Sequence, residues 1–412
     1  MSLNLTNYDN MIKVHYAPGP VLNMATAKNK AMGLIQKRNR KVSAGGKYWF
    51  QPIQISLPGG DSIDFGTAMA ATNNNSGYGG FAVTRKHQYR LAKVDNETIE
   101  ATADGDMDAF EPAFDEFDRN IEAEGNYINF RLFRGSSAHF AAMTNTNLAT
   151  TIMTLDDAAG VWAVVKGDVV NLSATAGTGS VKTGSLTVAS VQRSAGTITF
   201  TANISTGVPT AATSDFAFKA GDYGTGAISG FLDWLPDAAP SATLFYGQDR
   251  SQEPELLGGV RVDGTGGAPI HEVLIDQVVA IDNIGGEPDV CFINPFAAGS
   301  LTKQLEGKWV IMKGQGYGGK EAEIGYKGWQ VTIEGHEVVI MTDKHCQTKR
   351  SWMLQLDTFT MFSAGMAPGF LQKRAASIIK VSENADGYEA RVGEYFNVSN
   401  KGPGYSSNGQ LA

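Results

Sequence analysis

Cysteine is scarce in this 412-residue chain, and its scarcity excludes several classes of protein. Cys291 and Cys346 are too few for a disulfide framework or a four-thiolate metal site. Charged residues make up 18% of the chain, below the usual ~25%, whereas its 48 glycines exceed the average share. This composition excludes a coiled coil, a highly charged disordered chain and a collagen-like fibre. The length predicts two or three compact units.

Long apolar runs are also missing. No stretch of 18 uninterrupted apolar residues occurs, so we expect no membrane-spanning helix and no membrane partner. The N-terminal sequence MSLNLTNYDN has no basic segment leading into an apolar stretch, so we expect no secretory signal and synthesis in a reducing cytoplasm.

Charge is unevenly distributed, although the net value is only −8. Residues 28–47 carry seven basic side chains and no acid, and residues 104–124 carry nine acids and one base, Arg119. The sequence therefore contains a basic arm and, about 60 residues later, an acidic segment.

The first hundred residues predict elements that cannot bury themselves. Residues 1–46 have few apolar positions and two early prolines, which is typical of an extended arm. Residues 47–57 and 80–94 alternate as strands do, and the linker of residues 58–79 is far longer than an ordinary hairpin loop. We expect a long two-stranded flap, which is marginal alone and must lie on a neighbour.

From residue 106 the apolar period becomes helical. Phe110, Phe114, Phe117, Ile121, Ile128 and Leu132 form one stripe, and this predicts a long helix towards Arg134. The opposite face is expected to carry the acids Asp115, Glu116, Asp118, Glu122 and Glu124.

The region of residues 150–226 is rich in Thr, Ser, Gly and Val, with short alternating runs separated by turn residues. This pattern predicts an inserted antiparallel barrel or sandwich of five or six strands. Beyond it, helices are expected near residues 268–280 and 296–305, and several strands are expected to form one mixed sheet. We expect the last dozen residues to be loose.

The sharpest apparent motif is Gly314-Gln-Gly316-Tyr-Gly-Gly319, which matches G-x-G-x-x-G. A dinucleotide site needs a helix beginning at that point, and Gly325 and Gly328 leave room for barely one turn. A mobile glycine loop is the favoured interpretation. The alternative, an NAD-type oxidoreductase that uses this loop, stays open.

Other chemical candidates lack a supporting pattern. His336, Glu337, His345 and Cys346 have no metal-ligand spacing, and no G-x-S-x-G surrounds Ser136, Ser137 and His139. The acidic segment lacks calcium-loop spacing. We therefore expect no catalytic residue, no cofactor and no metal.

The basic arm has two interpretations, nucleic-acid binding and docking against the acidic segment of another subunit. The arm has no interleaved aromatic before Tyr48, which makes the nucleic-acid signature weak. The residues expected to make inter-subunit contacts are Lys37, Arg38, Arg40, Lys41, Arg85, Lys86, Arg90, Asp115, Glu116, Asp118 and Glu122.

The order of arm, flap, helix and later α/β region resembles the major capsid proteins of tailed bacteriophages, whose shell fold herpesvirus floor domains share. The segments that carry the resemblance are ISGFLDWLP (228–236), LFYGQDR (244–250), PDVCFINP (288–295), GYKGWQV (325–331) and TDKHCQ (342–347). The resemblance covers roughly residues 47–370.

The resemblance implies an α+β fold with an arm, an extended β-hairpin loop, a peripheral domain with a long spine helix and an apical α/β domain, here with an inserted β-barrel. The expected boundaries are 1–46 for the arm, 47–100 for the extended loop, 101–149 and 344–412 for the peripheral domain, 150–226 for the barrel and 227–343 for the apical domain.

The function that this resemblance implies is structural. The chain would self-assemble into pentamers and hexamers of an icosahedral head that encloses double-stranded DNA, and would be made in the host cytoplasm. Scaffolding, portal and decoration proteins are further partners, and the packaged DNA is contacted only non-specifically. A tail or decoration protein is a second alternative, based on the predicted barrel. Some family members cross-link a lysine to an asparagine, but no local motif assigns such a pair here.

Overall fold

The computed structural model describes residues 30–38, 40–42, 46–72, 75–95, 97, 112–177, 179–224, 226–305, 329–333, 335–364, 369–370, 379–381 and 386–412. Within these ranges no helix combines the length and apolarity needed to cross a bilayer. The predicted α+β fold is confirmed, since helices and three six-stranded sheets share the described chain.

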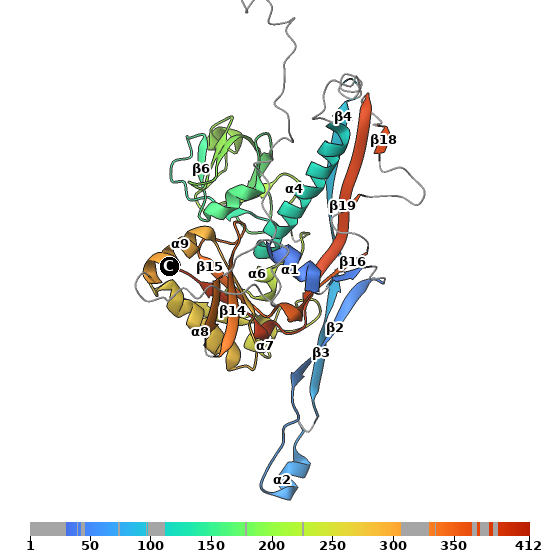
Figure 1. Ribbon diagram of the computed structural model, residues 1–412, viewed down its shortest axis with the longest axis vertical. Coiled ribbons are helices and arrows are strands. Elements are labelled where there is room, and N and C mark those ends of the chain that lie inside the picture. The colour runs from blue at the N-terminus through green and yellow to red at the C-terminus, as the bar shows by residue number, and fades with distance from the viewer. Residues whose placement is uncertain are drawn as a thin grey trace, which may run out of the picture.

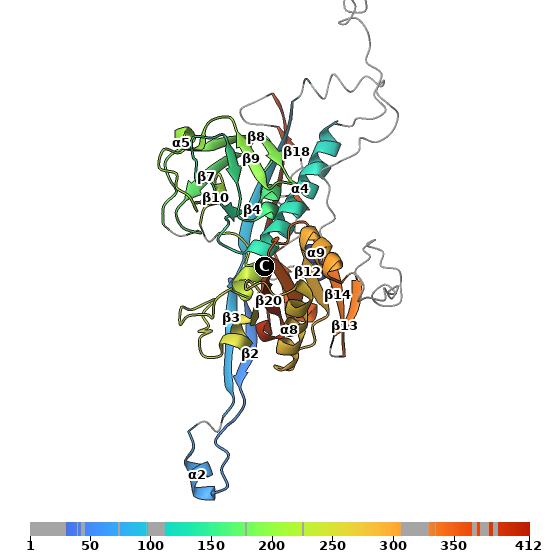
Figure 2. The same ribbon diagram turned by 90° about the vertical axis from the view of Figure 1, so that its left-hand side faces the viewer.

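One sheet is built around β19 (Gly387–Asn400), a strand of 14 residues. Its antiparallel neighbours are β4 (Lys86–Asp95) along residues 387–396 and β16 (Phe359–Ser363) along residues 396–400. The helix α4 (Pro112–Arg134) runs along β4 and β19 (Figures 1 and 2). The shorter strands of this sheet are β1 (Arg40–Val42), β17 (Gly369–Phe370) and β18 (Ile379–Val381).

The expected long helix is confirmed for the part of it that is described. Ile128 and Leu132 are each only 2% exposed, as the apolar stripe predicts. Pro112 opens α4, where its missing N–H costs no hydrogen bond. Glu124 was expected on the solvent face but is 1% exposed, because β4 and β19 cover that side of the helix. Residues 106–111 lie outside the described residues.

A second, mixed sheet has the strand order β11-β20-β15-β12-β14-β13. The helices α8 (Ile270–Asp282) and α9 (Pro295–Leu305) pack on it. Its strands are β11 (Val260–Asp263), β20 (Ser407–Gln410), β15 (Arg350–Leu354), β12 (Val290–Ile293), β14 (His336–Thr342) and β13 (Trp329–Ile333).

Both faces of this sheet are buried. In β12, Cys291 and Ile293 join the cluster under α8 and α9, whereas Val290 and Phe292 join the central core with α1, α4 and α6 (Phe231–Trp234). Successive strand residues point to opposite faces, so one apolar strand serves two cores. This explains why residues 290–293 form an uninterrupted apolar run before Asn294.

The predicted insertion is a closed barrel with its own core. Its strand order is β5-β10-β7-β8-β9-β6, and the bridge between Met143 and Leu155 joins the two edges. The barrel begins near Phe140 rather than residue 150, since β5 pairs with β10. Its strands are β5 (Ala141–Ala142), β6 (Ile152–Thr154), β7 (Val169–Ser173), β8 (Leu186–Gln192), β9 (Thr197–Phe200) and β10 (Phe216–Lys219).

The front of the chain differs from the prediction. Residues 30–42 of the expected free arm form α1 (Lys30–Arg38) and β1, which pack on the chain's own body. Ala31, Met32 and Ile35 are at most 6% exposed, and the Met32 amide donates to Asn129 Oδ1 on α4 at 3.0 Å. The sequence hid this helix because its short apolar stripe stands among basic residues. Residues 1–29 lie outside the described residues.

The expected flap is shorter than residues 47–100. Its hairpin pairs β2 (Tyr48–Ser56) with β3 (Gly77–Thr84), and the chain then changes sheets at Arg85. The single strand expected over residues 80–94 is therefore two strands, because Phe81 and Val83 enter the central core whereas β4 pairs with β19.

Two expectations for the C-terminal third were wrong. The boundary at 343/344 divides one sheet, because β15 and β20 pair with each other beside β12 and β14. The last dozen residues are not loose, since Ser407 and Asn408 are at most 1% exposed and β20 lies between β11 and β15. The sequence did not predict this strand because its residues are neutral and polar; backbone hydrogen bonds to β11 and β15 hold it in place.

Candidate assembly surface

The β2–β3 hairpin projects beyond the rest of the described body, with α2 (Phe65–Ala70) at its tip (Figures 1 and 2). Asp64 caps α2, because its carboxylate accepts from the Thr67 amide at 2.7 Å. None of the α2 residues is buried. The hairpin therefore presents an ordered tip that its own subunit leaves uncovered.

The hairpin exposes large apolar side chains that a lone soluble subunit would ordinarily bury. Ile63 at the tip is fully exposed, and Phe65 is 81% exposed. Several exposed apolar side chains on one projecting element are typical of a protein–protein contact site. The exposed large apolar and aromatic residues of the hairpin are Tyr48, Phe50, Leu57, Ile63, Phe65, Met69 and Tyr78.

The base of the hairpin is fixed by the central core. Phe81 is fully buried with its ring 5.0 Å from that of Trp234, and the Ala82 amide donates to the Tyr246 carbonyl at 2.8 Å. Asn397 Nδ2 also donates to the Thr84 carbonyl at 2.8 Å. These contacts set the direction in which the tip points.

Charge is nearly absent from the hairpin. Residues 48–84 contain no lysine, arginine or histidine, and their only acids are Asp61 and Asp64 at the tip. The hairpin is thus an apolar ribbon with a weakly acidic end.

A second uncovered surface lies on the side of β4 and β19 that faces away from α4; we name it the outer ribbon face. Tyr89 and Tyr395 meet there, with their hydroxyls 3.2 Å apart, and are 56% and 43% exposed. Leu91 is 45% exposed beside them. By register the same side carries these charged or titratable residues: His87, Lys93, Asp95, Arg391 and the buried Glu389, which is paired with Arg391 at 2.6 Å.

The structure places the predicted contact residues on several elements. Lys37 and Arg38 lie on α1, Arg40 and Lys41 on β1, and Asp115, Glu116 and Asp118 on α4, but their side chains lie outside the described part of the chain. Glu122 on α4 and Lys86 on β4 are half-buried.

Two of the predicted basic residues bind within their own subunit. Arg90 Nε lies 2.9 Å from Glu124 Oε2, which brings β4 and α4 together. Arg85 donates to the Gly46 carbonyl. The sequence analysis predicted that these bases pair with the acidic segment of another subunit. For Arg90 the acidic partner, Glu124, is instead in the same chain.

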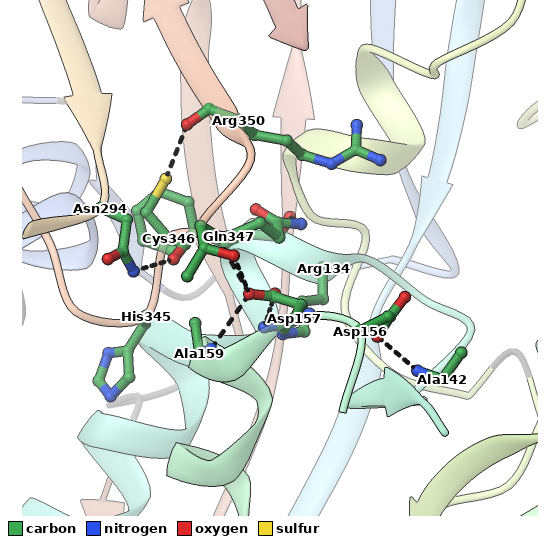
Figure 3. Close-up of polar contacts among 12 residues, drawn as sticks. Arg134, Ala142, Asp156, Asp157, Ala159, Asn294, His345, Cys346, Gln347 and Arg350 are labelled. Carbon is green, nitrogen blue, oxygen red and sulfur yellow. Dashed lines mark hydrogen bonds and ion pairs between the residues drawn. The ribbon is translucent and has the colours of Figure 1, made fainter. Parts of the chain in front are cut away.

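A polar junction fixes the barrel to the body (Figure 3). The Arg134 guanidinium lies 2.5 Å from Asp157 Oδ2, and Asp157 Oδ1 accepts from the Thr348 amide at 3.1 Å. Burial alone would raise the pKa of Asp157, but Arg134 and the amide donors hold it below its usual value. Helix α4, the barrel and the segment before β15 therefore meet at one carboxylate.

The catalytic candidates do not form a working site. Ser137 Oγ lies 2.7 Å from His139 Nδ1, but burial, together with nearby arginines, lowers the pKa of His139 to about 3, far from that of an effective general base. Burial raises the pKa of the Cys291 thiol above its usual range. Over the described ranges, no group of three or more His, Cys, Asp or Glu side chains could hold a metal. The Gly314–Gly319 motif lies outside the described residues.

The architecture has relatives among solved capsids. A cyanophage A-1(L) capsid asymmetric unit matches with a TM-score of 0.58 at 11% identity, over 99% of each chain. The capsid of a native GTA particle gives a TM-score of 0.49 at 8% identity, over 98% of this chain and 96% of that one. The capsid of cyanophage P-SCSP1u gives 0.47 at 11% identity, over 98% and 94%.

Sequence comparison adds nothing to these structural matches. No family model matches the chain. No curated protein matches it either. The cyanophage A-1(L) match covers 99% of the chain, so the chain has the fold of a phage capsid protein, as the sequence resemblance predicted.

Sequence reasoning missed the outer ribbon face and the apolar tip of the hairpin. A signal for the first was present, because His87, Tyr89 and Leu91 alternate along β4 on that face. The tip had a weaker signal, since Phe65 and Met69 stand in a stretch otherwise rich in Gly, Asn and Ala.

Proposed function

We propose that this chain is a structural shell protein that self-assembles into pentamers and hexamers of an icosahedral head around double-stranded DNA. The observation that carries the proposal is the uncovered apolar hairpin on a body with a capsid fold. In this proposal the mixed sheet with the strand order β11-β20-β15-β12-β14-β13, together with α8 and α9, forms the apical domain. The function of the protein is then to form contacts between subunits, not to catalyse a reaction.

The hairpin supports self-assembly because the described part of its own subunit does not bury its tip. A two-stranded ribbon is marginal in water unless it packs on something else. Each apolar side chain covered by a neighbour contributes roughly 25 cal/mol per Å² of buried area, although ordering the tip offsets part of this gain. Because the same contact repeats around a closed shell, many small contributions add up to stabilise the particle.

The receiving surface that we propose is the outer ribbon face of a neighbouring copy. Tyr89, Leu91 and Tyr395 offer apolar area to the tip. Lys93 flanks these residues, and Arg391 beside them is paired with Glu389 at 2.6 Å, whereas the tip carries the acids Asp61 and Asp64. Opposite charges of this kind set the register of a contact more than its strength.

Further partners follow from the same role. Scaffolding, portal and decoration proteins would contact the assembled shell, and DNA would touch it without sequence preference. We place the protein in the virion after its synthesis in the host cytoplasm. The acidic residues near the start of α4 would repel DNA wherever they face the lumen.

Electron microscopy of the full chain tests the proposal. We expect closed particles of megadalton mass, whereas a tail or decoration protein would give small oligomers. Replacing residues 57–76 by Asn-Gly joins β2 to β3 through a two-residue turn. We expect that variant to fold, with unchanged circular dichroism, but to give no particles. Normal particles from the shortened chain would contradict the role of the hairpin.

A further inference from the structure

Helix α4 packs on β4 and β19 along a seam (Figure 1). This seam contains a carboxyl group that has no partner in the described part of the chain. Glu394 of β19 is 1% exposed, and neither of its carboxyl oxygens has a hydrogen-bond partner among the described residues. It is in register with Gln88 of β4, on the side of the ribbon opposite the outer ribbon face. A buried ionised carboxylate without partners is among the costliest groups in a protein.

A second carboxyl group shares the seam. Glu124 of α4 is also 1% exposed; its Oε2 accepts from Arg90 Nε at 2.9 Å, and its Oε1 has no partner within the described chain. Arg90 therefore compensates the charge of Glu124, and the repulsion from Glu124 adds to the cost of ionising Glu394.

Two further charged groups near Glu124, Lys219 and Asp222, have ion-pair partners of their own. In the barrel, Lys219 lies 2.9 Å from Asp168, and Asp222 lies 2.9 Å from Arg131. Gly369 and Phe370 of β17, in register with Gly393 and Val392, are neutral. The adjoining elements also carry these charged or titratable residues: Lys86, His87, Lys93 and Asp95 of β4, Lys380 of β18, and Asp115, Glu116, Asp118, Arg119, Glu122 and Arg134 of α4. Of the β4 residues, His87, Lys93 and Asp95 are at register positions of the outer ribbon face.

We propose that Glu394 is a proton-operated latch: it is a neutral carboxylic acid while α4 is closed on β19, and loss of its proton to water drives the seam open. The geometry supplies the two states. When the seam is closed, the neutral acid avoids a second buried negative charge beside Glu124. When it is open, water hydrates the carboxylate and removes the penalty. The proposal concerns the single subunit and does not rest on the proposed shell function.

The direction of the pH effect follows from proton linkage. Burial, and then the repulsion from Glu124, raises the pKa of Glu394 to about 9 in the closed seam, whereas a hydrated glutamate titrates near ~4.3. The closed state thus binds one more proton than the open state between these values. Its stability is full at low pH and falls as pH rises towards 9, so the open-to-closed ratio grows up to about tenfold per pH unit.

Infrared spectroscopy and hydrogen exchange of the full chain test the latch. At pH 7 we expect the carbonyl stretch of a protonated carboxylic acid that Glu394→Gln removes. The protection factors of amides in residues 119–134 should fall with rising pH in the parent chain, and stay flat in Glu394→Gln, whose neutral amide imitates the protonated acid. Glu272→Gln, at an exposed carboxylate on α8, is the matched control and should behave as the parent.

A second variant keeps the test decisive if Glu394→Gln does not fold. Glu124→Gln removes the repulsion and frees Arg90, so the carboxylic acid band should disappear at a lower pH than in the parent. An unchanged midpoint in Glu124→Gln overturns the proposal. So does the absence at pH 7 of a band that depends on Glu394, or an equal pH dependence of protection in the parent and Glu394→Gln.

Discussion

Phe65 at the hairpin tip gives the sharpest test of how the subunits hold together. Its side chain is 81% exposed, and the helix that carries it has no buried residue. Replacing Phe65 by Ala therefore removes nothing from the subunit's own core. If the tip packs on a neighbouring copy, the same change removes a buried ring from every contact in the shell.

The size of the effect follows from the exposed area. A phenylalanine buries about 150 Å² or more when it is covered, so covering the exposed part of Phe65 contributes roughly 3 kcal/mol. Truncation to Ala keeps one carbon of the side chain, and we expect a loss of about 2 kcal/mol per contact. Each subunit donates one tip, so the concentration of free subunit in equilibrium with particles should rise about 30-fold.

Analytical ultracentrifugation measures that concentration directly. The melting temperature of the dissociated Phe65→Ala subunit should match that of the parent. Ile152→Ala, at a residue 45% exposed on the barrel, is the control and should leave the free-subunit concentration unchanged. Phe81→Ala, at the buried base of the hairpin, should instead lower the melting temperature. An unchanged free-subunit concentration in Phe65→Ala would refute the reasoning.

Three more predictions concern charge, pH and the barrel. Burial raises the pKa of Asp233 to about 6, so its contribution to stability is lost as pH rises from about 4 through 6; Asp233→Asn should abolish this dependence in denaturant titrations. Asp233→Ala should cost about 2–4 kcal/mol of unfolding free energy, because the Ser136 and Gly230 amides lose their acceptor. Deleting residues 140–219 should leave a folded body by circular dichroism, since the two ends of the insertion lie on the paired strands β5 and β10; an insoluble product would show that the barrel is integral. Replacing the four bases Lys37, Arg38, Arg40 and Lys41 by glutamate should lower the particle yield seen by electron microscopy without lowering the melting temperature. Normal particles from this variant would contradict inter-subunit charge pairing.

The spacing of apolar residues was enough to predict elements that are buried on one face or on both faces. The stripe through Ile128 and Leu132 predicted α4, and the apolar run before Asn294 predicted β12. The barrel was predictable because turn residues separate its short strands. By contrast, β20 consists of Ser, Asn, Gly and Gln, and only backbone pairing with β11 and β15 makes it a strand.

The candidate surface was less predictable than the fold because contacts depend on which copy supplies the partner. Charge counting paired a basic segment with an acidic one, but could not show that Arg90 and Glu124 meet within one chain. Nor could it show that Glu124 and Glu394 share one seam, since 270 positions of sequence separate them and only the fold brings β19 to α4.

The position of β20 has a consequence for how the protein is made. This strand lies between β11 and β15 in a sheet whose other described strands all precede it in the sequence, and β19 is likewise preceded by all its described partner strands in the second sheet. A nascent chain that has emerged from the ribosome only as far as residue 363 lacks both, so neither sheet is complete. Truncated translation products would then leave β11 and β15, and β4 and β16, without the strand that pairs with both.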